Sequence, residues 1–271
     1  MRTSTNLPRN LTILSLLVVG FLPLLSGCSG REDIPRFPPG IAPDDMVRLM
    51  HRRALVFGGI DAEYEVRVSA GKGTVEFKGI VAADFPERSH FQLSYPKEPP
   101  ILEFILQGRS VQFYSPVALK QLSSTLDELM QKPSQLVAMA EAMSYIHGDL
   151  SDFSPYGMQV STGLFVFSRK MGDIDVRALV APETLTLRSL LYSSNDTVLF
   201  SIEYSKFITV NEGVLPLEIS ASSPEFNVRL STGGFQLSGR HSPTAFSFQY
   251  IPGTVSAASL DDLLDDVTWH D

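Results

Sequence analysis

The chain has 271 residues, a formal net charge of −8 and a single cysteine. The acidic balance argues against nucleic-acid binding and against electrostatic docking on anionic lipid, because both need an excess of basic side chains. One cysteine allows no internal disulfide, so the fold must be stabilised by a hydrophobic core. A chain of this length is long enough to bury one.

The first 27 residues have the parts of a secretory signal peptide. A basic start with Arg2 and Arg9 precedes an apolar run from Leu11 to Leu24, and small residues follow. The run is shorter than the ~20 apolar residues that a bilayer crossing needs. Because residues 1–27 contain two arginines and no acidic residue, their removal leaves 244 residues with a net charge of −10.

Cys28 ends the sequence Leu25-Ser26-Gly27-Cys28, which has the form of a bacterial lipobox. A cysteine thiolate is nucleophilic and therefore a suitable lipid acceptor. We predict cleavage before Cys28 and its acylation with chains such as palmitate, two or more of which anchor a protein stably. Ser29 favours the outer membrane over the inner membrane, with the domain facing the periplasm. The alternative is an ordinary signal peptide with a chance cysteine nearby.

Residues 28–43 form a proline-rich tether, and residues 44–271 are predicted to form one domain without an internal boundary. Residues 44–57 have helical spacing, with Asp44 or Asp45 as the cap and Gly58 at the end. We expect the basic residues of this helix to be mostly solvated. They are His51, Arg52 and Arg53.

Between residues 61 and 113 the apolar residues alternate with polar ones, which predicts about five antiparallel strands joined by short turns. The same alternation returns between residues 157 and 250 and predicts six or more further strands. Ser259 and Asp262 are a candidate capping pair for a short acidic helix near the end of the chain.

Residues 116–148 interrupt the alternation and predict two helices, one opening at Pro116 and one capped by Ser134. Their apolar sides are rich in methionine, at Met130, Met139 and Met143. Methionine is flexible and adapts to irregular partners. Two interpretations stay open: simple core packing, or a lid over an apolar cavity.

No catalytic chemistry is predicted. The sequence contains no phosphate-binding loop, no zinc-protease motif and no nucleophile elbow, and its five histidines are scattered. The acidic residues between 261 and 266 lack the glycine and the spacing of a calcium loop, which favours a solvated helix face. We therefore expect a protein that is not an enzyme and that uses no metal or cofactor.

The order of elements together with the lipobox resembles the LolA/LolB superfamily of bacterial lipoprotein carriers and their lipoprotein relatives. Residues 88–96, followed by the strand 101–107, look like the family's strand that ends in an Asn-Pro-type turn. Residues 204–220, with Gly213 and Pro216, look like its G-x-x-x-P connection. The resemblance implies a mainly β (α+β) fold, a half-open antiparallel β-barrel of about eleven strands with a helical lid or plug.

One turn departs from the family pattern. LolB-like carriers have an apolar residue at the turn after the first proline, whereas this chain has Lys97, Glu98, Pro99 and Pro100. Inserting a charged tip into a bilayer costs several kcal/mol. The resemblance therefore implies the fold, and it leaves open whether the protein inserts lipoproteins into membranes.

The resemblance also implies an apolar cavity that binds a lipid or the acyl chains of another lipoprotein, since each buried methylene contributes about 0.8 kcal/mol. The alternative is a filled core, in a non-catalytic structural or assembly lipoprotein that docks on an outer-membrane protein partner. The predicted cavity residues are Phe77, Phe91, Leu93, Phe104, Leu106, Phe113, Met139, Met143, Phe165, Phe200, Ile202, Val228, Phe246 and Phe248.

Overall fold

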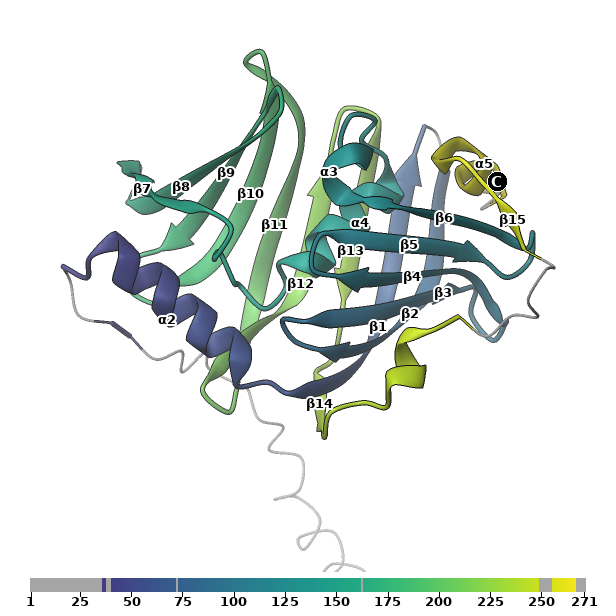
Figure 1. The fold of residues 1–271 in the computed structure, drawn as a ribbon, viewed down its shortest axis with the longest axis horizontal. Helices are drawn as coiled ribbons and strands as arrows, with labels where there is room; N and C mark the ends of the chain where they lie inside the picture. The colour runs from purple at the N-terminus through teal and green to yellow at the C-terminus, as the bar shows by residue number, and fades with distance from the viewer. Residues whose placement is uncertain (1–35, 38–39, 72, 162, 249–254, 267–271) are drawn as a thin grey trace, which may run out of the picture. The chain divides into compact units, whose positions relative to one another are not determined.

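The computed structural model describes residues 36–37, 40–71, 73–161, 163–248 and 255–266 (Figure 1). The predicted signal peptide, the lipidation site Cys28 and most of the tether prolines lie outside these residues, so the predicted division of the chain stays a prediction. Of the tether, Phe37 contacts the domain, because its backbone N–H donates to the carbonyl of Glu183 at 2.7 Å.

The predicted N-terminal helix is confirmed as α2 (Pro43–Leu55). Pro43 lies in the first turn, where a proline costs no hydrogen bond. Ala42 is the N-cap residue and offers no side-chain acceptor, so Asp44 and Asp45 stand within the first turn instead of capping it. The helix buries one side against the sheet through Met46, Met50 and Ala54.

The predicted five-stranded meander is also confirmed, and its alternation is visible in the burial of each strand. Within the first strand, Tyr64, Val66 and Val68 are buried while the residues between them are exposed. The strands are β1 (Gly59–Ala70), β2 (Gly73–Asp84), β3 (Arg88–Ser94), β4 (Pro100–Gln107) and β5 (Ser110–Ser115).

The predicted helix from Pro116 to Met130 is wrong, because β6 (Lys120–Thr125) occupies much of it. This strand pairs along its whole length with β5, from Lys120 opposite Ser115 to Thr125 opposite Ser110. The available strand edge outweighs a weak helical preference in a segment that contains Ser123, Ser124 and Thr125. Only α3 (Leu126–Leu129) is helical, with a capping box formed by Thr125 and Glu128.

The second predicted helix is confirmed as α4 (Gln135–Ser144), with Ser134 as its cap. The chain then returns to strands. They are β7 (Ser154–Ser161), β8 (Leu164–Met171), β9 (Ile174–Ala181), β10 (Thr186–Ser194), β11 (Thr197–Val210), β12 (Gly213–Ser222), β13 (Phe226–Ser231), β14 (Phe235–Ser238) and the short β15 (Ser256–Ala257).

Among the described residues, fifteen strands form one sheet. Its order is β15-β6-β5-β4-β3-β2-β1-β13-β12-β11-β10-β9-β8-β7, and β14 pairs with the first part of β1. All pairings are antiparallel except that of β15 with β6. The sheet is open, since β15 and β7 stand at opposite ends of this order (Figure 1). This confirms the mainly β, half-open fold, with more strands than expected.

The helix α4 lies on the inner face of the sheet and contacts β4 on one side and β11, β12 and β13 on the other (Figure 1). These strands are far apart in the sheet order, so the sheet must curve around the helix. Eight of the ten residues of α4 are buried. A helix that is apolar on nearly all sides belongs inside a core.

Close packing explains why position 213, part of the predicted G-x-x-x-P connection, is a glycine. It begins β12, and a Cβ atom built on it would lie 2.2 Å from the ring of Phe57. Phe57 is itself buried directly after α2 and contacts Phe85 edge-on at a ring distance of 6.2 Å. Glycine therefore lets α2 and β12 approach each other closely.

The capping pair near the end of the chain is confirmed. Ser259 Oγ accepts from the backbone N–H of Asp262 at 3.2 Å, and the Asp262 carboxylate accepts from the backbone N–H of Ser259 at 2.8 Å. The helix that follows is α5 (Leu260–Asp266), which buries Leu260 and Leu263. It contacts β5 and β6.

The predicted strand from Phe246 to Tyr250 is wrong in its described part. Residues 239–248, here called the outer segment, contain a 3-10 turn, η2 (Pro243–Phe246), and contact β3. Phe248 packs on Tyr114 at a ring distance of 5.1 Å and on His90, whose neighbour Phe91 faces the core. Phe246 and Phe248 therefore lie on the outer face of the sheet and not in the predicted cavity.

His241 attaches the outer segment to the sheet. Its Nδ1 lies 2.7 Å from Asp84 Oδ1, and its Nε2 lies 3.0 Å from Asp61 Oδ1. Arg88 also pairs with Asp84, at 2.9 Å, and its guanidinium lies 4.1 Å above the ring of Phe246. Burial lowers the pKa of His241, but its bonds to Asp84 and Asp61 outweigh this, so the net pKa is raised above the ordinary value of 6.5.

We predict that His241→Gln destabilises the protein by about 1–3 kcal/mol at pH 6 and by clearly less at pH 9. A raised folded-state pKa gives stability that is complete below pH 6.5 and is lost as the pH rises through that pKa. Burial raises the pKa of Asp84, but the bonds to His241 and Arg88 outweigh this, so the net pKa is lowered. The stability that Asp84 contributes is therefore lost at acidic pH. Urea unfolding of both proteins at the two pH values measures the difference; an equal cost at both would contradict the charged pairing.

Candidate functional site

The structure brings together most of the predicted cavity residues. Phe165 is half-buried, on β8. The others on the inner face are at most 3% exposed and belong to one continuous core. They are Phe77, Phe91, Leu93, Phe104, Leu106, Phe113, Met139, Met143, Phe200, Ile202 and Val228.

Aromatic rings line the inner face on both sides of α4. Phe91 stacks on Phe104 at a ring distance of 4.9 Å, and Phe104 continues to Phe113 at 5.6 Å. In the other half of the sheet, Tyr192 stacks on Phe200 at 4.3 Å with the ring planes 6° apart. Such pairs add about 0.5–1.5 kcal/mol beyond their buried area. The inner face of the sheet is thus a broad apolar surface on both sides of α4.

In this conformation α4 itself lies against that lining. Met139 and Met143 are fully buried between the helix and the sheet. A hollow beside the end of α4, lined by α2 residues and by β10, β11 and β12, has a volume of about 20 Å³. A water molecule needs about 10–15 Å³ on this measure, so the hollow holds one water and no acyl chain.

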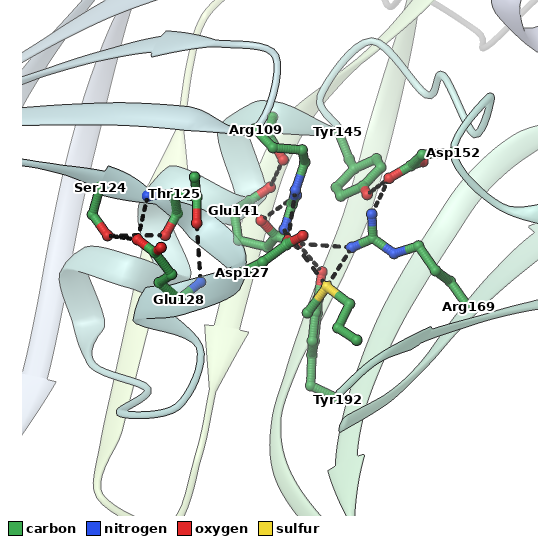
Figure 2. Close-up of polar contacts among 12 residues, drawn as sticks. Arg109, Ser124, Thr125, Asp127, Glu128, Glu141, Tyr145, Asp152, Arg169 and Tyr192 are labelled. Atoms are coloured by element: carbon green, nitrogen blue, oxygen red, sulfur yellow. Dashed lines mark hydrogen bonds and ion pairs between the residues drawn. The ribbon is translucent and has the colours of Figure 1, made fainter. Parts of the chain in front are cut away.

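A buried charge that sequence reasoning missed lies at the centre of the site. Glu141, on α4, is completely buried. Its carboxylate accepts from Arg109 Nη1 at 2.7 Å and from the hydroxyl of Tyr192 at 2.6 Å. Arg109 stands in the turn between β4 and β5 and Tyr192 on β10, so Glu141 joins the helix to both halves of the sheet (Figure 2).

A second arginine completes this cluster. Arg169, on β8, lies 3.9 Å from Glu141 and forms an ion pair with Asp152, which also accepts from the hydroxyl of Tyr145 (Figure 2). Arg109 additionally pairs with Asp127 at 2.7 Å. We call these residues the buried charge cluster: Glu141, Arg109, Arg169, Asp127, Asp152, Tyr145 and Tyr192.

The electrostatics follow from this arrangement. Burial alone would lower the pKa of Arg109, but the negative charge of Glu141 outweighs it and the pKa is raised. Burial and then the charge of Glu141 raise the pKa of Tyr192 well above its ordinary value. Both groups therefore keep their protons at neutral pH, and the cluster is a stable set of donors around one carboxylate.

The cluster positions the helix, and it resembles no catalytic constellation. Its charges pair with one another, with only Arg169 Nε lacking a hydrogen-bond partner among the described side chains of the cluster, whereas a general base or nucleophile must reach a substrate. No group of three or more metal-ligating side chains occurs in the described part of the chain. Within the same residues, no helix has the length and apolar character needed to span a membrane.

One signal could have revealed the cluster. Glu141 is the only charged residue in the otherwise apolar helix between Leu136 and Met143. A buried carboxylate requires a paired cation, because an unpaired buried charge is costly. Its partners are Arg109 in the turn between β4 and β5 and Arg169 on β8, both far away in the sequence, so their identity depends on the fold.

We predict that Glu141→Gln destabilises the protein by about 3–5 kcal/mol, because it leaves two arginines near the core without their shared carboxylate. Urea unfolding measures the change. Glu212→Gln, at an exposed position in the turn before β12, is the matched control and should change stability by less than about 0.5 kcal/mol. Similar values for the two variants would contradict the role of the cluster.

No protein-family model and no curated protein matches the sequence. Solved structures do match the fold. A LolA superfamily protein, NE2245 from Nitrosomonas europaea, aligns at 14% identity over 78% of this chain and 100% of its own, with a TM-score of 0.57. A putative outer membrane lipoprotein-sorting protein domain from Vibrio parahaemolyticus aligns at 9% identity over 74% of this chain and 94% of its own, with a TM-score of 0.56.

A DUF1329 family protein from Desulfovibrio piger aligns at 11% identity over 76% of this chain and 96% of its own, with a TM-score of 0.58. Identities this low establish the fold and leave the activity open. The predicted resemblance is confirmed at that level: the chain has the open antiparallel half-barrel fold of the LolA superfamily proteins, with a helix on its inner face.

Proposed function

We propose that the protein is a lipid-anchored envelope protein that binds an acyl chain, of a lipid or of another lipoprotein, between the inner face of the sheet and α4. One observation carries this proposal. The helix that fills the half-barrel is apolar on nearly all sides and contacts the sheet through Met139 and Met143. Methionine side chains repack readily around a new partner.

In this proposal, an acyl chain replaces α4 as the apolar group that covers the inner face of the sheet. An acyl chain offers the aromatic lining the same kind of contact that α4 offers, at about 0.8 kcal/mol per buried methylene. Binding between the sheet and α4 requires the helix to move, because the hollow beside its end has a volume of only about 20 Å³. The buried charge cluster sets the cost of that movement, since Glu141 leaves its donors when the helix leaves the sheet.

The anchor would keep this domain near its lipid source. Cys28 precedes Phe37, whose backbone N–H donates to the domain, by nine residues. A fully extended chain spans about 3.3–3.6 Å per residue, so Phe37 would stay within about 30 Å of the acylated membrane surface. Ser29 supports the outer membrane and a periplasmic domain, with the inner membrane as the lesser alternative.

The Vibrio parahaemolyticus protein of the same fold is described as a putative lipoprotein-sorting domain, which supports an acyl ligand. The turn at Lys97 and Glu98 argues against insertion of lipoproteins into a bilayer. Both side chains are exposed, in a turn closed by the bond from Glu98 N–H to the carbonyl of Tyr95 at 3.0 Å. We therefore propose binding or carriage, without membrane insertion and without catalysis.

A second candidate is a structural or assembly lipoprotein that docks on an outer-membrane protein. The close packing of α4 against the sheet favours it, because a filled half-barrel needs no ligand. The two candidates differ in whether the inner face ever exchanges its helix for lipid.

We predict that residues 29–271, produced in a bacterium and extracted with organic solvent, release acyl lipid in roughly equimolar amount. Native mass spectrometry before extraction should show the bound mass and should lose it afterwards. Protein that is reproducibly lipid-free, and that takes up no added acyl lipid, would favour the assembly candidate.

We predict that Cys28→Ala abolishes metabolic labelling with a palmitate analogue and releases the protein from membranes, because no other cysteine can accept the lipid. Ser29→Ala is the matched control and should remain labelled. Persistent labelling of the Cys28 variant would show that the lipobox is misassigned, whatever the domain binds.

A further inference from the structure

Arg53, on α2, has an unusual environment for an arginine. Its Nη1 donates to the backbone carbonyl of Thr184 at 2.6 Å and lies 3.4 Å from that of Leu185. Its Nη2 is shielded from solvent and has no hydrogen-bond partner. The ring of Phe37 covers the guanidinium at 4.6 Å. The expectation that Arg53 is mostly solvated is therefore wrong.

Among the described residues, no carboxylate pairs with this guanidinium. Burial lowers the pKa of Arg53, and in the described part of the chain no acidic group raises it. Arg109 and Arg169 differ from Arg53 because each pairs with carboxylates, although Arg169 Nε also has no hydrogen-bond partner. A guanidinium that loses water without gaining an anion is costly to keep, and an unfilled N–H donor adds to that cost.

Arg53 lines the hollow beside the end of α4. The other walls are mostly apolar and include Met50, Ile146, Leu187 and Val214. His147 also lines it, but burial lowers the pKa of His147 to about 4, so that ring is neutral at pH 7. The hollow is therefore lined by one positive charge, on a residue with an unpartnered donor, and otherwise mostly by apolar side chains.

We infer that this hollow receives the carboxylate head group of a single-chain fatty acid, with one carboxylate oxygen accepting from Arg53 Nη2. The hollow, at about 20 Å³, has room for one such oxygen in the present conformation. The hydrocarbon chain continues along the apolar walls when α2 or α4 yields, beginning at the flexible Met50. This inference rests on the proposed acyl-chain binding and selects the ligand class: an anionic fatty acid in preference to a neutral glyceride.

The experiment compares three probes on residues 29–271, which include every described element. Dodecanoate has the charge and the chain, dodecanol has the chain alone, and acetate has the charge alone. Isothermal titration calorimetry at pH 7.5 measures each affinity. We expect dodecanoate to bind at least about tenfold more tightly than dodecanol, as for a hydrogen bond to a charged group, and acetate to bind weakly or not at all.

Two variants test the residue. Arg53→Gln should weaken dodecanoate binding about tenfold or more and leave dodecanol binding unchanged. Arg52→Gln, at the exposed neighbouring position on α2, should change neither. Circular dichroism checks the folding of both variants. If Arg53→Gln does not fold, the ratio of dodecanoate to dodecanol affinity in the unaltered protein still tests the inference.

The contradicting outcomes are distinct. Equal affinities for dodecanoate and dodecanol would overturn the role of Arg53 and leave acyl-chain binding intact. Acetate binding as tightly as dodecanoate would identify a small-anion site and overturn the fatty-acid assignment. Binding of neither chain-bearing probe would overturn both this inference and the proposed function.

Discussion

The structure depends on one buried carboxylate. Glu141 is the only charged group on a helix that otherwise presents apolar side chains to the sheet, and its two shortest bonds reach Arg109 in one half of the sheet and Tyr192 in the other. Apolar packing alone is tolerant of sliding and rotation, whereas a desolvated ion pair is satisfied in one position only. The charge cluster therefore determines where α4 lies, and the apolar lining determines how strongly it is held.

This division of roles is compatible with the proposed replacement of α4 by an acyl chain on the inner face of the sheet. The lining of Phe91, Phe104 and Phe200 is chemically indifferent to whether methionine side chains or methylenes cover it. The specific cost of opening is electrostatic and is concentrated at the cluster. Arg53 has the opposite character, because its guanidinium has no carboxylate partner among the described residues and its Nη2 has no hydrogen-bond partner, at the hollow where α2 meets the end of α4. In the proposed mechanism, the charge cluster holds α4 against the sheet and Arg53 binds the anionic head group.

Periodicity in the sequence predicts much of the fold but not its long-range contacts. The buried faces of α2, β1 to β5 and α4 follow from local spacing and are confirmed. The predicted helix from Pro116 is wrong because the apolar spacing there fits a helix, whereas the pairing of this segment with β5 depends on tertiary structure. Phe246 and Phe248 alternate like strand residues but cover the outer face. The roles of Glu141 and Arg53 depend on oppositely charged partners that are distant in sequence. Glu141 has such partners and Arg53 has none among the described residues, and local sequence patterns predict neither.

The central claim is that α4 is a plug that an acyl chain displaces. Hydrogen exchange of the backbone amides of α4, measured on residues 29–271 with and without a saturating acyl lipid, tests it most directly. The account predicts that the lipid strongly reduces protection between residues 138 and 144 while β3, β4 and β11 remain protected. Unchanged or increased protection of α4, in protein shown to contain the lipid, would contradict the account.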